Sequence, residues 1–180
     1  LTEHCIARIE SRDGEINAVV TRDFETALTN AKAADAAQKR GEVLGRIHGV
    51  PITVKDALQT KGLRSTGGAV ELRDNVPERD APVVDAVRRE GAIVIGKTNL
   101  PRWSGDIQSY NELFGTTNNP WDLSRGPGGS SGGAAAAGAM GFTSFEIGTD
   151  IGGSIRFPAA FNGVWGHKPS FGLLPTTGYL

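Results

Sequence analysis

The sequence predicts an α/β fold in which helices pack against a β-sheet. Short apolar runs within "HGVPITVKDAL" (48–58) and "AIVIGKTN" (92–99) have the composition of buried strands. Segments with helical periodicity, such as 1–14 and the alanine-rich 23–42, come before them. Because helices and strands alternate, the chain favours a layered α/β domain, and 180 residues can bury a sizeable core.

The individual elements follow from local patterns of apolar residues and from helix start and stop signals. The expected helices are 1–14, which stops at Gly14, then 23–42 with Asp23 as N-cap, 80–92 ending at Gly91, 131–141, and a short helical turn at 154–161. The expected strands are 16–22, a strand ending near Lys55, 92–99 and 143–150, and residues 101–125 are expected to be irregular.

The composition argues against several classes of partner and site. Nineteen basic and 20 acidic residues give a net charge of -1, which fits neither a nucleic-acid footprint nor a polybasic membrane surface. With no run of 18 apolar residues and no basic-then-apolar leader, we expect a cytoplasmic protein. Cys5, the single cysteine, is expected to be a small buried apolar residue. The histidines His4, His48 and His167 are too scattered to predict a metal site.

One motif match is to the phosphate-binding loop. "GAIVIGKT", at 91–98, fits G-x-x-x-x-G-K-[ST]. That loop follows a strand and opens a helix, whereas the middle residues here are Ala-Ile-Val-Ile, which favour the strand itself. A helix precedes them and Pro101 follows soon after, so a strand and a turn are the preferred interpretation.

A second match is to the nucleophile elbow of α/β-hydrolases. "GGSSG" fits G-x-S-x-G twice, and Asp150 and His167 follow in the chain order of that catalytic triad. The elbow requires a buried strand before the serine, but the preceding "NPWDLSRGP" is polar and holds two prolines. His167 is therefore interpreted as a structural or pocket residue.

A third candidate site joins Lys55, at the end of an apolar strand, with two glycine-rich turns. Gly152 and Gly153 allow a tight bend before Ser154. The N–H groups of Ile151, Gly152, Gly153 and Ser154 would then be free to form an oxyanion hole.

A serine needs a base to become nucleophilic, and lysine can serve only when it is neutral. The pKa of Lys55 must therefore fall from about 10.4 toward neutrality, which the apolar residues that flank it would cause. Asp56 need not pair with Lys55, because neighbours in a strand point to opposite faces. Asp150 and Arg156 could pair and brace the second glycine turn.

These stretches resemble the amidase signature family. The resemblance rests on "GPGGSSGGAAAA" followed by "IGTDIGGSIRFPAAFNGVWGHKPSFG", with "LGRIHGVPITVKDAL", "IVIGKTNLPRWSGD" and "YNELFGTTNNPWDLSR" upstream. These long, specific motifs run from about residue 45 to the end. The resemblance implies the amidase signature fold, a mixed twisted sheet covered by helices. It also implies that residues 1–180 are the N-terminal part of a single domain that continues beyond Leu180.

The resemblance also implies a Ser–cis-Ser–Lys triad. Lys55 matches the lysine, Ser130 the bridging serine with a cis peptide bond before it, and Ser154 the nucleophile, with Ser131 as a supporting hydroxyl. Such an enzyme hydrolyses an amide through an acyl-enzyme and needs no cofactor, so the expected partner is a small-molecule amide. His167 stands where amidotransferase subunits typically have leucine, which leans toward a general amidase. The amidase subunit of a tRNA amidotransferase, a catalytically silent scaffold and a homodimer of the full-length protein stay open.

Overall fold

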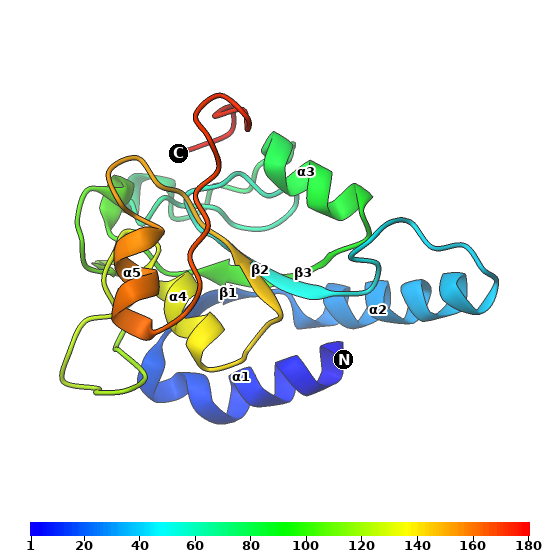
Figure 1. Ribbon diagram of the computed structural model, residues 1–180, viewed down its shortest axis with the longest axis horizontal. Helices are drawn as coiled ribbons and strands as arrows, with labels where there is room; N and C mark the ends of the chain where they lie inside the picture. The colour runs from blue at the N-terminus through cyan, green and yellow to red at the C-terminus, as the bar shows by residue number, and fades with distance from the viewer.

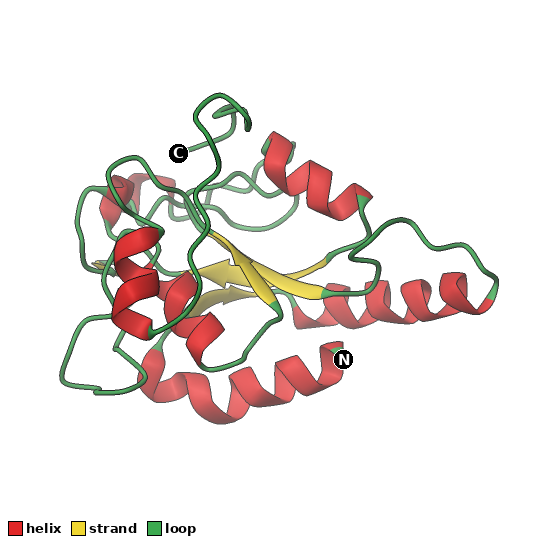
Figure 2. Ribbon diagram, in the orientation of Figure 1, coloured by secondary structure: helices red, strands yellow, loops and turns green.

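The computed structural model describes every residue from Leu1 to Leu180 and shows a β-sheet with helices on both faces (Figures 1 and 2). The helices are α1 (Thr2–Ile16), α2 (Phe24–Lys39), α3 (Pro82–Arg89), α4 (Gly132–Ala139) and α5 (Arg156–Asn162), with 3-10 turns at Val70–Leu72 and Arg102–Ser104. The strands are β1 (Val19–Arg22), β2 (Pro51–Lys55), β3 (Ile93–Thr98), β4 (Tyr110–Asn111), β5 (Gly115–Thr116) and β6 (Phe145–Ile147). No helix combines the length and the apolar character needed to cross a bilayer.

The main sheet has the strand order β1-β3-β2-β6. Strand β2 is parallel to both β3 and β6, whereas β1 is antiparallel to β3, which confirms the predicted mixed α/β sheet. Strands β4 and β5 form a separate two-stranded ribbon inside the region expected to be irregular. The carboxyl ends of the three parallel strands meet at one edge of the sheet, where open α/β sheets usually bind ligands.

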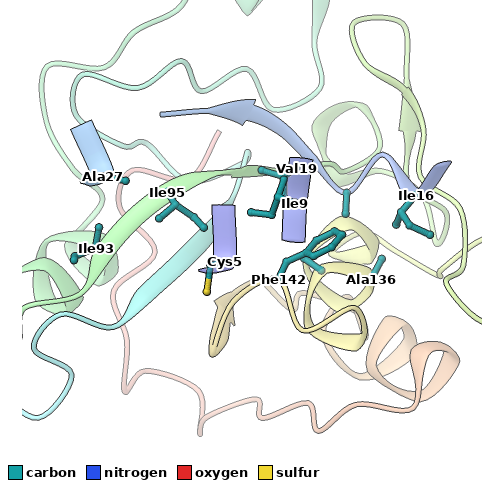
Figure 3. Packing of buried hydrophobic residues seen from close by; sticks show 11 residues of the cluster. Cys5, Ile9, Ile16, Val19, Ala27, Ile93, Ile95, Ala136 and Phe142 are labelled. Carbon is teal, nitrogen blue, oxygen red and sulfur yellow. The ribbon is translucent and has the colours of Figure 1, made fainter. Parts of the chain in front are cut away.

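Two apolar clusters cover the two faces of the sheet. The first packs α1, α2 and α4 against β1 and β3 and includes Ile9, Ile95 and Phe142 (Figure 3). Cys5 is buried in this cluster, as the sequence predicts. The second cluster places Val84 of α3 against Ile52 and Val54 of β2 on the other face. Both faces of β2 and β3 are therefore buried, which explains why these strands read as continuous apolar runs.

Strand β3 contains an irregularity that decides where its lysine points. Ile52 pairs with Val94 but Thr53 pairs with Gly96, so β3 carries one extra residue, Ile95. An extra residue of this kind inverts the alternation of side chains beyond it. Val54 pairs with Lys97 after the bulge, so Lys97 shares the face of Val54 and not that of Lys55.

Several helix boundaries differ from the sequence prediction, and one predicted cap does not form its hydrogen bond. Helix α1 continues through Gly14 to Ile16, because Ile16 is buried in the first cluster and Asn17 ends the helix in a left-handed conformation. Asp23 occupies the predicted N-cap position of α2, but its side chain makes no capping hydrogen bond. Helix α2 also ends at Lys39, before the predicted end at residue 42.

Candidate active site

Lys55 is the last residue of β2 and is completely buried. Its Nζ atom lies 2.5 Å from Ser130 Oγ and 2.8 Å from Thr149 Oγ1. Burial lowers the pKa of Lys55 to about 7, against the opposing influence of the negative charge on Asp150. Both contacts of the amine are hydroxyl groups, which can donate or accept a hydrogen bond. Lys55 can therefore exist as a neutral amine in this place.

Ser130 lies in the glycine-rich stretch 126–133, which needs glycine at particular positions. Gly128 has a φ of +79°, and the Gly129–Ser130 peptide bond is cis. A Cβ atom on Gly133 would lie 2.4 Å from the backbone nitrogen of Asn99, so α4 begins directly against the end of β3. This close approach brings the buried Ser130 to the amine of Lys55.

Ser131 connects the two glycine-rich turns. Its hydroxyl donates to the carbonyl of Thr149 at 3.1 Å and accepts from the N–H of Thr149 at 3.2 Å. Its own N–H donates to the carbonyl of Ser154 at 3.1 Å. Thr149 thus contacts both Lys55 and Ser131, a role that the sequence does not reveal because Thr149 is one of many hydroxyl residues in the region.

Asp150 and Arg156 brace the second glycine turn. The carboxylate of Asp150, whose side chain is 1% exposed, accepts hydrogen bonds from the Arg156 guanidinium at 3.0 Å through both Nε and Nη2. It also accepts from the N–H groups of Gly153 and Ile155. The bonds from Arg156 hold the pKa of Asp150 well below its usual range, and the backbone bonds add to this effect against the opposing effect of burial. Asp150 is therefore a fixed negative charge inside the turn.

The expectation of four free N–H groups is wrong for one of them. Gly153 donates its N–H to Asp150 Oδ1 at 2.8 Å, because the carboxylate lies inside the turn and reaches this donor. Ile151, Gly152 and Ser154 have N–H groups with no acceptor in the protein. Ser154 is partly exposed, and no hydrogen bond joins its hydroxyl to Ser130. The structure thus brings Ser154 to Ser131 through the backbone, whereas Lys55 and Ser130 meet through their side chains.

Neither competing motif forms the site that its pattern suggests. Ile93–Thr98 of the phosphate-loop match is strand β3 itself. Asp150, the acid of the elbow match, forms an ion pair with Arg156 and makes no hydrogen bond with His167. His167 is exposed and makes no hydrogen bond to either serine, so it does not form a triad with them, and its interpretation as a structural or pocket residue stays a prediction.

A cleft of about 440 Å³ lies beside the Ser130 turn, and Gly68, Arg102, Asp106 and Tyr110 contribute to its lining. Ser130 and Ser154 do not line it. The segment 107–109 separates cleft and turn. A Cβ atom on Gly129 would lie 2.3 Å from the carbonyl oxygen of Gln108, and the Ser109 hydroxyl donates to the carbonyl of Gly128.

Comparison with known proteins supports the resemblance along the whole chain. The sequence profile of the family described as Amidase matches residues 1–180. The chain is 49% identical over 171 residues to a glutamyl-tRNA(Gln) amidotransferase subunit from Moorella thermoacetica, and the match covers 95% of this chain and 35% of that protein. The corresponding subunit from Alkaliphilus metalliredigens is 45% identical over 175 residues, covering 97% of this chain and 36% of that protein. The chain thus spans little more than a third of the length of these relatives.

Solved structures of amide hydrolases have the same fold. Native peptide amidase from Stenotrophomonas maltophilia superposes with a TM-score of 0.93 and 36% identity over 99% of this chain and 38% of that one. A bacterial aryl acylamidase of the amidase signature family gives a TM-score of 0.84 and 38% identity over 88% of this chain and 33% of that one. With the profile match over every residue and this agreement in fold, the chain belongs to the amidase signature family.

Proposed function

We propose that Lys55, Ser130 and Ser154 act together as the catalytic triad of an amidase, which hydrolyses a small carboxylic acid amide to an acid and an amine or ammonia. The observation that carries this proposal is the contact between the buried amine of Lys55 and Ser130 Oγ, 2.5 Å apart. No carboxylate forms an ion pair with Lys55. A lysine with a pKa of about 7 can take up a proton near neutral pH, as a general base must.

In the first step, Ser154 attacks the carbonyl carbon of the amide. Ser130 Oγ takes the proton of Ser154 Oγ and passes its own proton to neutral Lys55. A carbon–oxygen bond forms, Lys55 becomes an ammonium group, and the carbonyl oxygen becomes an oxyanion. The serine hydroxyl is thereby activated without a histidine.

In the second step, the carbon–nitrogen bond breaks. The leaving nitrogen takes a proton from Ser130, which is resupplied by the Lys55 ammonium, and an ester remains on Ser154. Water then attacks this ester while the same two residues accept its proton. When the ester bond breaks, Ser154 regains its proton and the acid leaves. These steps require only the protein, the amide and water, so no cofactor is assigned.

The oxyanion is assigned to the second glycine turn. Ile151, Gly152 and Ser154 have N–H groups without acceptors, and each such donor lowers the barrier by about 3–4 kcal/mol when it points at the developing charge. The Gly153 N–H, bound to Asp150, instead helps to hold the turn in shape. The ion pair between Asp150 and Arg156 supports this positioning role.

The test is to trap the acyl-enzyme on the full-length protein. The protein is mixed with an aryl amide or the corresponding activated ester, quenched in acid, digested and examined by mass spectrometry. We expect the acyl mass on the peptide that contains Ser154, and its loss in Ser154→Ala. Ser144→Ala, which removes an exposed serine outside the site, is the matched control and should keep the adduct. An adduct on another residue, or none at all, would contradict the assignment of the nucleophile.

A second candidate function is the amidase subunit of a tRNA amidotransferase. The observation that favours it is the 49% identity to the glutamyl-tRNA(Gln) amidotransferase subunit from Moorella thermoacetica. The same triad would then release ammonia from an amide donor for transfer within a complex. The two functions differ in their need for partners. If the protein is a general amidase, we expect it to hydrolyse simple amides alone, whereas for an amidotransferase subunit we expect the rate to rise when partner subunits are added.

We also infer that residues 1–180 form the N-terminal part of a single, longer amidase domain. The support is that the match covers nearly all of this chain but only 35% of the Moorella thermoacetica relative. Large apolar side chains, among them Ile151, Trp165 and Phe171, are exposed around and after the second glycine turn. In a longer domain, further elements would cover them and complete the substrate pocket.

A further inference from the structure

Lys97, the lysine of the "GKT" motif, is as deeply buried as Lys55 but faces the opposite side of the sheet. Its Nζ atom donates to the carbonyl of Leu58, to Thr60 Oγ1 at 2.8 Å and to Ser65 Oγ at 2.9 Å. All three acceptors belong to the loop that follows β2. The lysine thus ties this loop to the neighbouring strand β3.

The hydrogen bonds around Lys97 identify it as a charged group. The Thr60 hydroxyl donates its own proton to the carbonyl of Leu58, and the Ser65 hydroxyl donates its proton to the carbonyl of Leu63. With both hydroxyl protons directed at these carbonyls, each hydroxyl accepts from Lys97, and three donated hydrogen bonds match the three protons of an ammonium group. The contacts of Lys55 impose no such demand. Charge-assisted bonds of this kind are stronger than neutral ones.

Asp56 holds the far end of the same loop. It makes no direct ion pair with Lys97, but its negative charge raises the pKa of Lys97 against the larger, opposing effect of burial. Asp56 Oδ2 accepts from the N–H of Thr66 at 3.1 Å and from the Thr66 hydroxyl. Thr66 Oγ1 in turn accepts from the N–H of Gly68 at 3.0 Å.

The residues that follow Thr66 in the chain pack against the segment that lines the cleft beside the Ser130 turn. Gly67 accepts a hydrogen bond from the N–H of Trp103 at 2.8 Å, and a Cβ atom on Gly68 would lie 3.2 Å from the backbone of Arg102. Gly68 and Arg102 both line the cleft. The position of this wall therefore depends on the loop that Lys97 contacts along residues 58–65 and that Asp56 contacts at Thr66.

We propose that the cleft beside the Ser130 turn binds part of the substrate and that Lys97 is a positioning residue for it: the buried ammonium group of Lys97 clamps residues 58–65 to β3 and so fixes the wall to which Gly68 contributes. Lys97 contacts neither the triad nor the cleft and acts through the loop alone. The role in catalysis rests on the proposed amidase function, whereas the clamp itself is a property of the fold. Lys55 is thus assigned to proton transfer on one face of the sheet, and Lys97 to positioning of a loop on the other face.

The test compares Lys97→Met with Lys61→Met in the full-length protein. Lys61 is an exposed lysine of the same loop whose side chain makes no hydrogen bond or ion pair, so the substitution is matched in chemistry and place. For Lys97→Met we expect KM for an aryl amide to rise about tenfold while kcat changes by less than about threefold. Labelling of Ser154 by a small fluorophosphonate, which does not need the cleft wall, should keep its rate. Lys61→Met should match the wild type in all three measurements.

Ser65→Ala removes one acceptor from Lys97 and provides a milder variant if Lys97→Met does not fold. We expect KM to rise about threefold in Ser65→Ala, again without a change in labelling rate. Unchanged KM in Ser65→Ala and in any folded Lys97→Met would overturn the proposal. A fall in the labelling rate that parallels the loss of amide turnover would also overturn it, because Lys97 would then act on the triad.

Hydrogen exchange separates this inference from the proposed function. In Ser65→Ala, the N–H groups of Thr66 and Gly68 should exchange about tenfold faster than in the wild type, whether or not the protein is an amidase. If Ser154 is not labelled in the wild type but these groups exchange faster, the proposed function fails and the clamp stands. If their exchange is unchanged, the clamp fails.

Discussion

Lys55 and Lys97 lie on neighbouring strands and are both fully buried, yet their surroundings give them different chemistry. Burial lowers the pKa of both, to about 7 for Lys55 and to about 8 for Lys97. The amine of Lys55 contacts two hydroxyl groups. The amine of Lys97 contacts one carbonyl and two hydroxyl groups, and both of these hydroxyls are placed to donate to other carbonyls. The hydrogen-bond partners of the two lysines therefore differ, although both side chains are equally buried.

Replacing Lys55 by methionine should remove amide turnover and leave the fold intact. Methionine is similar in size and apolar, so it fits the buried position, but it cannot accept a proton. We expect kcat/KM to fall by about 10³-fold or more. Because a buried lysine with a lowered pKa destabilises the folded state below its unfolded pKa, the melting temperature of Lys55→Met at neutral pH should be equal to or higher than that of the wild type.

The control for this change is His167→Ala, which removes an exposed side chain and should retain substantial activity. Steady-state kinetics on an aryl amide, together with thermal unfolding, measure both effects. The reverse order, an active Lys55→Met and an inactive His167→Ala, would favour the hydrolase-elbow triad.

Glu146 should make the stability of the protein depend on pH. Its carboxyl group accepts hydrogen bonds from Thr53 and Thr143, and burial raises its pKa from 4.5 to about 8, against the lowering effect of these bonds. Between these values the folded state keeps a proton that the unfolded state loses, so the free energy of unfolding falls as the pH rises from 4.5 to about 8. Above pH 8 the effect is complete.

Glu146→Gln stays neutral at every pH and should remove this dependence. The variant should gain stability relative to the wild type as the pH rises, by at most about 1.4 kcal/mol per pH unit. Chemical unfolding at several pH values measures the difference. Parallel stability curves for the two proteins would show that the carboxyl group of Glu146 does not titrate in this way.

The start of helix α4 requires glycine for a reason that does not apply to Gly138 near its end. A Cβ atom on Gly133 would lie 2.4 Å from the nitrogen and 2.6 Å from the oxygen of Asn99, both backbone atoms. At Gly138, in the same helix, the nearest atom to a new Cβ is a side-chain carbon of Glu146 at 3.9 Å. The two positions therefore form a matched pair for testing how tightly α4 packs on β3.

Gly133→Ala should lower the free energy of unfolding by about 2–4 kcal/mol, because α4 or the end of β3 must shift. Gly138→Ala should be neutral or stabilising by up to about 1 kcal/mol, since alanine is the better helix former. Chemical unfolding of both variants gives the comparison. Equal effects at the two sites would mean that the close approach of α4 to β3 is not as described.

The sequence predicts most elements but not all of their contacts. Strands β2 and β3 and helix α4 lie where apolar runs and the glycine–alanine stretch place them, because these signals are local. The bulge at Ile95 cannot be read from the sequence, since β3 is buried on both faces and alternation gives no register. For the same reason the face of Lys97 is not predictable. Helix α1 passes Gly14 because burial of Ile16 outweighs the helix penalty of one glycine, about 1 kcal/mol.

The same limits hold for the candidate site. Lys55 and the serine turns stand out as sequence motifs, and the contact of Lys55 with Ser130 agrees with them. The capture of the Gly153 N–H by Asp150 depends on where a carboxylate falls inside a folded turn. The contact of Thr149 with Lys55 depends on the pairing of β2 with β6. Such contacts arise between segments far apart in sequence, so local patterns do not encode them.

For the whole molecule, the exposed apolar residues predict the behaviour of residues 1–180 produced alone. Trp165 and Phe171 are fully exposed, and Ile151 is 82% exposed. Apolar surface of this kind favours association. We therefore expect these residues alone to be poorly monodisperse and to have little amidase activity, and we expect Trp165→Ser with Phe171→Ser to reduce the association. Light scattering measures the association, thermal unfolding measures the cooperativity of melting, and hydrolysis of an aryl amide measures the activity. If residues 1–180 alone are monodisperse, melt cooperatively and are active, the expectation is wrong.

If neutral Lys55 activates Ser154 through Ser130, the rate at which Ser154 is labelled must depend on pH. The rate at which a small fluorophosphonate labels Ser154 is measured in the full-length protein across a range of pH and located by mass spectrometry. Because only the neutral lysine can accept a proton, the rate should rise with pH through an apparent pKa near 7 and level off above it. The rise should be absent in Lys55→Met. A labelling rate that is independent of pH, or one that survives in Lys55→Met, would show that Lys55 does not activate Ser154.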